Sequence, residues 1–246
     1  MARGMGFRRE QFAPGEVYHL LNRGVEGRTV FLDDADRVHF LHLLAYHLRP
    51  SPVPFSHRTR FSQSSAPHGR QSLGELLLEL LCFALMPNHF HLLVRQAAEA
   101  GVSRYMQRVL NSYARYFNTR HRRSGPLFAG QYRAVHVGTD EQLVHVSRYI
   151  HLNPYVAGLT RHPLDAPWTS LPVYVDHPRE PYPPLGPPVS TELVQSLIPR
   201  GEYARFLTDH AGYARALGHI KYLLLEEDPL ALRQEVRVGR LRRSAL

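Results

Sequence analysis

Two histidines one residue apart, His89 and His91, are the side chains whose type and spacing most directly suggest chemistry. They lie in an apolar, strand-forming run from 81 to 94 that is interrupted at Pro87-Asn88. Side chains alternate between the two faces of a strand, so both imidazoles point the same way, about 7 Å apart. Two such imidazoles supply half of a divalent-metal site. The alternative is a pair of ordinary histidines on a solvated sheet face, since the chain has 16 histidines.

A helix is predicted downstream of this strand. Thr139 is a suitable N-cap, and Gln142, three residues later, completes a capping-box pattern. Pro154 is expected to end the helix, because the residue before a proline disfavours the α conformation. A buried stripe at helical spacing is formed by Leu143, Val146 and Ile150.

The same helix carries His145, Tyr149 and Asn153 on another face, because residues four apart lie one above the other. A tyrosine and an amide side chain are therefore presented together near the helix end. The alternative for this segment alone is a half-buried tyrosine with no chemical role.

Taken together, these two segments resemble the REP-associated tyrosine transposases, a branch of the HUH-type single-tyrosine transposase family. The resemblance extends over about residues 7–172. Its matching segments occur in the family's order, at 7–9, 18–25, 30–36, 40–41, 85–94, 112–118, 149–159 and 167–170.

The resemblance implies that Tyr149 attacks a DNA phosphate and forms a 5′-phosphotyrosine with release of a 3′-hydroxyl. It also implies a metal held by His89, His91 and Asn153. An N,N,O ligand set with open positions suits Mg²⁺ or Mn²⁺. Free tyrosine has a pKa of about 10, so the nucleophile needs activation. His145 and His151 are near in sequence, but we interpret them as neighbours rather than as a dedicated base.

The substrate implied by the resemblance is single-stranded DNA, beside an imperfect hairpin. A basic groove with stacking surfaces is the physical requirement for such a partner. A monomer with Tyr149 acting in cis is favoured over the dimers of related insertion-sequence enzymes. The candidate DNA contacts, each of which could instead be an ordinary surface residue, are Arg8, Arg9, Asn22, Arg23, Arg133 and Arg148.

The expected fold class is α+β, with a ferredoxin-like βαββαβ sheet followed by the tyrosine-bearing helix and a C-terminal helical extension. Both crossover helices are expected on one sheet face, leaving the face with His89 and His91 open. The predicted strands are 16–22, 78–86, 89–95 and 131–137, and the predicted crossover helices are 34–48 and 102–121.

Three parts of the chain are distinguished by composition. Residues 1–170 form the catalytic domain, in which the proline- and serine-rich loop 49–73 is expected to be mobile. Residues 171–189 are a proline-rich linker, and 190–246 a helical extension with a basic tail.

Composition agrees with a partner that is a polyanion. The formal net charge is +9 and the pI is about 10.0. The single cysteine, Cys82, excludes a disulfide within the chain and fits a reducing cytoplasm. Neither a signal peptide nor a run near the roughly 18 apolar residues of a membrane span is found.

Three other functions remain open at this point. A rolling-circle initiator or relaxase uses similar residues, although the βαββαβ order with its tyrosine helix last argues against it. A metal-dependent hydrolase without a covalent step would not need Tyr149. A DNA-binding module that has lost catalysis would not need to keep His89, His91, Tyr149 and Asn153.

Overall fold

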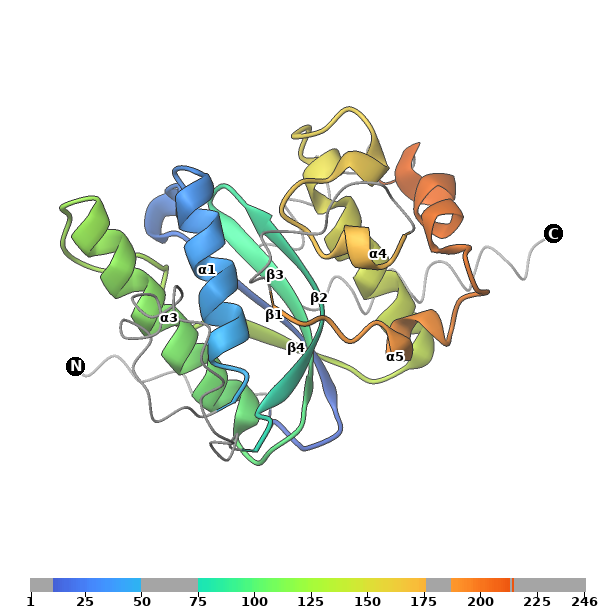
Figure 1. Ribbon diagram of the computed structural model, residues 1–246, viewed down its shortest axis with the longest axis horizontal. Coiled ribbons are helices and arrows are strands. Elements are labelled where there is room, and N and C mark those ends of the chain that lie inside the picture. Colours follow the sequence, from blue (N-terminus) through green and yellow to red (C-terminus); the bar gives the residue numbers. More distant parts are fainter. Residues whose placement is uncertain (1–10, 50–74, 176–186, 213, 215–246) are drawn as a thin grey trace, which may run out of the picture.

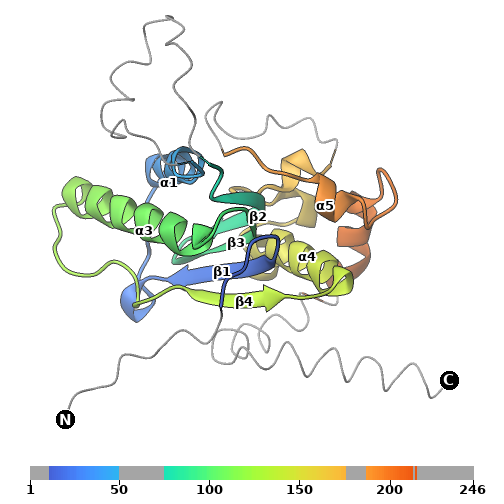
Figure 2. The ribbon, with the colours of Figure 1, turned by 90° about the horizontal axis from the view of Figure 1, so that it is seen from below.

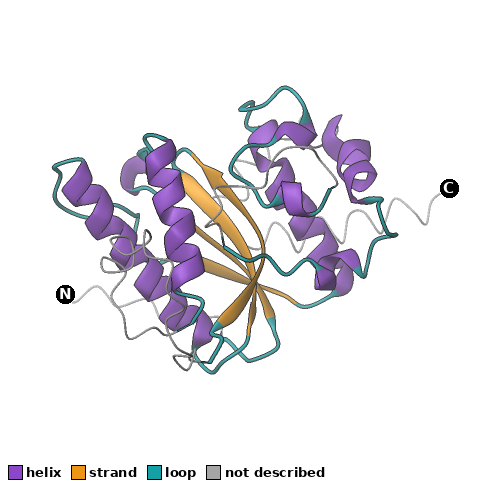
Figure 3. Cartoon of the chain, viewed as in Figure 1, coloured by secondary structure: helices purple, strands orange, loops and turns teal. Residues whose placement is uncertain are grey.

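The computed structural model describes residues 11–49, 75–175, 187–212 and 214. Arg8, Arg9, almost all of the loop expected at 49–73, the middle of the proline-rich linker and the basic tail lie outside these ranges. In the described part, a four-stranded sheet separates two groups of helices (Figures 1 and 3).

The sheet is antiparallel throughout, with the strand order β2-β3-β1-β4. Its central strands are β1 (Val17–Arg23) and β3 (His89–Gln96), and its edge strands are β2 (Leu78–Met86) and β4 (Arg133–Val137). Consecutive elements alternate as βαββαβ, which confirms the predicted ferredoxin-like class.

Helices α1 (Asp34–Tyr46) and α3 (Gly101–Arg120) lie side by side on one face of the sheet (Figure 2). The β3 side chains that meet them are Phe90, Leu92 and Val94, all fully buried in the larger core cluster. The alternation predicted for this strand is therefore confirmed, and the histidines point to the opposite face.

That opposite face is not open as predicted, because α4 (Asp140–Val156) packs across β2 and β3 (Figure 1). The prediction was wrong for a physical reason. Beyond the histidines, this face is apolar at β-strand residues such as Leu81, Ala84 and Leu93, and an apolar sheet face requires a covering layer. Later residues complete that layer, with Leu171, Tyr174, Tyr203 and Leu207 buried in the same cluster.

The start of α4 forms as predicted. The Thr139 hydroxyl accepts a hydrogen bond from the Gln142 amide at 3.1 Å, and Gln142 Oε1 accepts one from the Gly138 amide at 3.0 Å. Its end was predicted wrongly, because Pro154 lies inside the helix. Pro154 cannot donate to the Ile150 carbonyl, but the last turn is still closed by the bond from the Ala157 amide to the Asn153 carbonyl, 2.9 Å long.

The chain after α4 returns to the sheet edge. Thr169 forms an isolated antiparallel bridge with Ala84 of β2, and the Ser190 amide donates to the Leu80 carbonyl at 2.9 Å. Short helical pieces follow at η3 (Leu171–Val173), α5 (Glu192–Gln195) and 203–212. At the described start of the expected linker, the Tyr174 hydroxyl donates to the Leu81 carbonyl of β2 at 2.6 Å, while the division into three parts stays a prediction.

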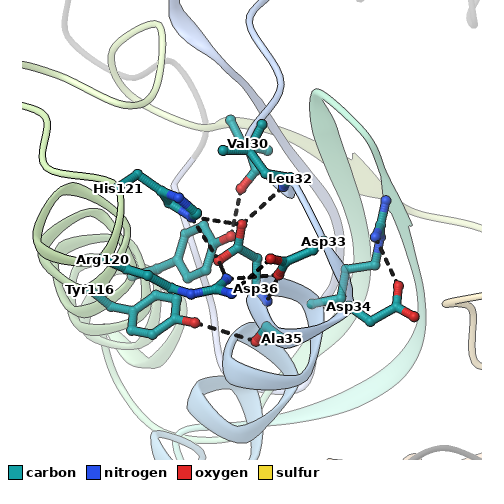
Figure 4. Close-up of polar contacts among 11 residues, drawn as sticks. Val30, Leu32, Asp33, Asp34, Ala35, Asp36, Tyr116, Arg120 and His121 are labelled. Carbon is teal, nitrogen blue, oxygen red and sulfur yellow. Dashed lines mark hydrogen bonds and ion pairs between the residues drawn. The ribbon is translucent and has the colours of Figure 1, made fainter.

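Charged groups join α1 to the end of α3 on the far side of the sheet (Figure 4). Asp36 is fully buried and accepts hydrogen bonds from Arg120, from His121 at 3.0 Å and from the Leu32 amide at 2.9 Å. Arg120 also forms two 2.7 Å bonds with the carboxylate of Asp33, the N-cap of α1. A buried carboxylate is tolerated here because each oxygen has a partner.

Candidate active site

His89 and His91 lie on the α4 side of β3, and both are buried, with exposed fractions of 3% and 4%. Their ring centroids are 5.0 Å apart in an edge-to-face arrangement. The alternative of two histidines on a solvated sheet face is therefore contradicted. A buried imidazole needs defined partners, and each of the two has them.

Helix α4 places Asn153 and Tyr149 against this pair. Asn153 Nδ2 lies 3.3 Å from His91 Nε2, and the Tyr149 ring centroid lies 5.5 Å from that of His91. A 180° flip of the Asn153 side-chain amide exchanges Nδ2 and Oδ1, so Oδ1 can occupy the same position. Tyr149 is half-buried, which leaves part of its side chain accessible from outside. The predicted set of His89, His91, Tyr149 and Asn153 is therefore brought together within one chain.

A third histidine, His19 of β1, belongs to the same cluster and was missed from the sequence. Its Nε2 lies 3.0 Å from His91 Nδ1, and the two rings stack at 5.1 Å. The Tyr149 ring lies 6.1 Å away, edge to face. The topology could have indicated part of this contact, because a ferredoxin-like strand order makes β1 and β3 neighbours. The register is also needed, since the pairing of Leu21 with His91 is what places His19 beside His91.

Burial keeps these imidazoles neutral at pH 7. It lowers the pKa of His19 and of His89 to about 4, and that of His91 well below its ordinary value. The neighbouring positive charge of Arg23 contributes to the shift at His89. A neutral ring retains one unprotonated nitrogen, which is the form that binds a metal.

These residues fit a divalent metal through their donor chemistry. His89 Nδ1 lies 2.7 Å from Asn88 Oδ1, an oxygen that can only accept, so Nδ1 carries the proton and Nε2 is the unprotonated nitrogen. His91 Nε2 faces the Asn153 amide, whose oxygen is a third donor. Among the described residues, no three His, Cys, Asp or Glu side chains form a metal cluster. A centre here would therefore depend on the amide.

The two histidines nearest Tyr149 in sequence have other partners. His151 is fully buried, with Nδ1 2.7 Å from the Tyr203 hydroxyl and Nε2 2.8 Å from the Ser170 hydroxyl. Both of its ring nitrogens are thus occupied. His145 is exposed, and its Nδ1 lies 2.7 Å from the guanidinium of Arg148.

The candidate DNA contacts that the structure describes differ in their surroundings. Asn22 is buried and donates to the Gly130 carbonyl at 3.3 Å. Arg23 of β1 is paired with His89 of the neighbouring strand β3. Arg148 lies 4.4 Å over the Phe206 ring, and Arg133 is exposed at the start of edge strand β4. Arg133 and Arg23 therefore have the more suitable positions, and DNA contact by any of these residues stays a prediction.

Comparison with known proteins agrees with this geometry at the level of family. Residues 68–153 match the family model described as "Transposase IS200 like". Over these residues the chain is similar to the IS200-like transposases. The matched region includes His89, His91, Tyr149 and Asn153, so the predicted recognition is confirmed there. No curated protein shows significant similarity to the chain.

Two solved structures are similar to this chain. One is a REP-associated tyrosine transposase bound to a REP hairpin, with 14% identity and a TM-score of 0.47 over 76% of this chain and 93% of that one. The other is a putative transposase from Deinococcus radiodurans R1, with 17% identity and a TM-score of 0.31 over 61% of this chain and 95% of that one. Among the described helices, none has the length and apolar character needed to cross a membrane.

Proposed function

We propose that this protein is a metal-dependent endonuclease and strand transferase for single-stranded DNA, with Tyr149 as its nucleophile. The observation that supports this proposal is the meeting of Tyr149 and Asn153, from one helix, with His91 of a neighbouring strand. A hydroxyl nucleophile beside a set of potential metal ligands is the arrangement that phosphodiester transfer requires.

In the proposed reaction, Tyr149 Oη bonds to the scissile phosphorus and the bond from phosphorus to the 3′ oxygen breaks. The 3′ oxygen takes up a proton and leaves as a hydroxyl, while the 5′ phosphate stays on the tyrosine. Attack by another 3′-hydroxyl reverses these bonds and joins strands without ATP. A bound Mg²⁺ or Mn²⁺ would supply charge neutralisation at the phosphate. His89, His91 and Asn153 would hold it.

Asn153 couples the nucleophile to this metal position. It lies one helical turn after Tyr149, so any movement of α4 moves both side chains together. Tyr203 holds helix α4 in place through its hydroxyl, which bonds to His151 and donates a second hydrogen bond to Ser147 at 3.1 Å. We infer that the tyrosine acts in cis, because every member of the site comes from one chain, and that a monomer is sufficient.

Hairpin-flanked repeat DNA is the proposed natural substrate. The similar solved transposase is bound to a REP hairpin, and the same partner is proposed for this chain. The net charge of +9 is suited to a polyanion. The proposed phosphate contacts near the site are Arg23, which is paired with His89 on the neighbouring strand, and Arg133 on β4.

Of the other functions, a relaxase is disfavoured, because the tyrosine helix follows the complete βαββαβ sheet and the matched family is a transposase family. A metal-dependent hydrolase and a silent DNA-binding module both keep the same fold. They are distinguished from the proposal only by whether a covalent adduct forms.

The decisive experiment incubates the protein with labelled single-stranded DNA from the flanks of its own gene and with Mn²⁺. A phosphotyrosine ester survives denaturation, so the wild type should give a shifted band in a denaturing gel. Tyr149→Phe should give none and should still bind DNA, since only a hydroxyl is lost. Cleavage without any adduct would establish the hydrolase, and binding without cleavage the silent module.

Tyr155 provides the matched control for this experiment. It lies inside α4, six residues after Tyr149, and therefore on a different side of the helix. Tyr155→Phe should form the adduct as the wild type does. An adduct that is lost in Tyr155→Phe and kept in Tyr149→Phe would refute the assignment of the nucleophile.

A further inference from the structure

The contact between His19 of β1 and His91 of β3 joins the two central strands of the sheet. The ring nitrogens are 3.0 Å apart, within hydrogen-bond range, and the planes are inclined by 26°. His19 has an exposed fraction of 3%, so water does not compete freely for this bond. The contact is made on the β1 side of His91, and the Tyr149 ring of α4 lies 6.1 Å from the ring of His19.

The two nitrogens of His91 have different partners. Nδ1 faces His19, and Nε2 faces the Asn153 amide on α4. A neutral imidazole carries its proton on one nitrogen only. A proton on Nδ1, donated to His19 Nε2, leaves the lone pair of Nε2 directed toward Asn153. A proton on Nε2 would instead block the side of the ring that faces the other candidate ligands.

We propose that His19 is a positioning residue, which accepts a hydrogen bond from His91 Nδ1 and thereby holds His91 in the tautomer that binds metal through Nε2. This proposal rests on the proposed function for the presence of a metal. Metal-ligating histidines ordinarily give their second N–H to a carboxylate, a carbonyl or water, and that partner fixes both the tautomer and the orientation of the ring. Asn88 orients His89 in the same way, because its Oδ1 accepts a hydrogen bond from His89 Nδ1 at 2.7 Å.

His19 is not itself placed as a metal ligand. Its Nε2 is engaged by Nδ1 of His91, whereas the predicted ligand set meets His91 at Nε2, on the opposite edge of the ring. The His91 nitrogen that would hold a metal is thus the one that does not face His19. The structure therefore predicts two histidine ligands, each oriented by a neighbouring side chain of its own.

The first measurement is of tautomers in the metal-free protein, by long-range ¹H–¹⁵N correlation of the histidine rings. Wild-type His91 should be protonated on Nδ1 with Nε2 bare. The second measurement is the Kd for Mn²⁺, followed by the electron paramagnetic resonance of free Mn²⁺. His19→Ala should weaken Mn²⁺ binding by about 10- to 100-fold, the range seen when the partner of a ligating histidine is removed.

Two further variants separate positioning from other roles. His19→Gln retains an acceptor oxygen and should restore the Nδ1–H tautomer and Mn²⁺ affinity to within a few-fold of wild type. His136→Ala removes a histidine of β4 that bonds to Glu16 instead, and should leave Mn²⁺ affinity unchanged. All four proteins are compared below their melting temperatures, so that unfolding does not enter the result.

Three results would overturn the proposal. An unchanged His91 tautomer and Mn²⁺ affinity in folded His19→Ala would show that His19 has only a packing role. A third histidine nitrogen coupled to bound Mn²⁺ in the wild type, lost in His19→Gln, would make His19 a ligand. Protonation of His91 on Nε2 in the wild type would reverse the proposed direction of the bond. None of these readouts depends on formation of the DNA adduct.

Discussion

Replacing Tyr203 with phenylalanine tests whether residues beyond the sheet hold the tyrosine helix in place. The Tyr203 hydroxyl belongs to a buried chain of hydrogen bonds between 203–212, α4 and the segment after it. It donates to Ser147 Oγ at 3.1 Å, and Ser147 donates to the Val144 carbonyl at 2.8 Å. It accepts from His151 Nδ1 at 2.7 Å.

The rest of this hydrogen-bond chain can be assigned with one donor and one acceptor for each bond. With its proton on Nδ1, His151 accepts at Nε2 from the Ser170 hydroxyl, 2.8 Å away, and Ser170 Oγ accepts from the Phe83 amide of β2 at 2.8 Å. Burial lowers the pKa of His151 to about 3, in agreement with a neutral ring. The four side chains of this chain of hydrogen bonds are all buried, and each has a partner: Ser147, His151, Ser170 and Tyr203.

Tyr203→Phe leaves the buried His151 Nδ1–H without an acceptor and removes one donor from Ser147. A buried donor that loses its partner costs about 1–3 kcal/mol, and Ser147 retains its bond to Val144. We therefore expect the free energy of unfolding to fall by about 2–3 kcal/mol. Urea denaturation followed by circular dichroism measures this change, and hydrogen exchange should show that amides of α4 lose protection first.

Tyr116→Phe is the control, because it removes a tyrosine hydroxyl whose bond to the Ala35 carbonyl is 3.5 Å long and exposed. It should cost less than about 0.5 kcal/mol. Equal losses in the two variants would refute the reasoning, as would a stability loss in Tyr203→Phe that is spread evenly over the sheet. Either result would mean that the hydroxyl chain does not support α4.

Two further predictions concern the helices on the other face. Asp36→Asn should lower the free energy of unfolding by about 2–3 kcal/mol, which is less than for a fully buried pair because the Arg120 side chain is 32% exposed. Asp34→Asn changes an exposed pair and should cost under about 0.5 kcal/mol. Urea titrations compare the two variants, and equal costs would contradict the structure. Stability should also fall as pH drops from about 6.5 towards 4, since burial lowers the pKa of His39 and of His47 to about 4 and the unfolded chain then binds more protons. His39→Phe, which keeps the stacking on Tyr116 at 3.6 Å, should reduce this loss in a pH series of melting curves, and an unchanged pH dependence would count against His39 as a source.

Most of the sheet could be predicted because its strands are defined by local pattern. The alternation of His89, Phe90 and His91 determines which side chains face α1 and α3 and which face α4, and the structure follows it. The helical repeat of 3.6 residues likewise predicted the shared face of Tyr149 and Asn153. These are properties of a few neighbouring residues, and a repeat of two or of 3.6 is sufficient to read them.

The remaining features depend on contacts between distant parts of the chain. His19 reaches His91 only through the register of β1 on β3, which no local pattern determines. The covered face was missed because Tyr174 and Tyr203 complete it, and both follow stretches that look irregular in the sequence. Pro154 was given too much weight: near a helix end its missing N–H affects little, and α4 continues to Val156.

The order of these residues along the chain has a consequence for biosynthesis. His19 lies in the first strand, whereas Tyr203, which holds the tyrosine helix, follows the whole sheet. At roughly 5–20 residues per second, a ribosome takes on the order of 10 to 40 seconds to pass from one to the other. Throughout that interval the nascent polypeptide contains histidines without their helix, or a helix without its support. The cluster of His19, His91 and Tyr149, on a helix supported by Tyr203, can therefore assemble only after residue 203 has been made.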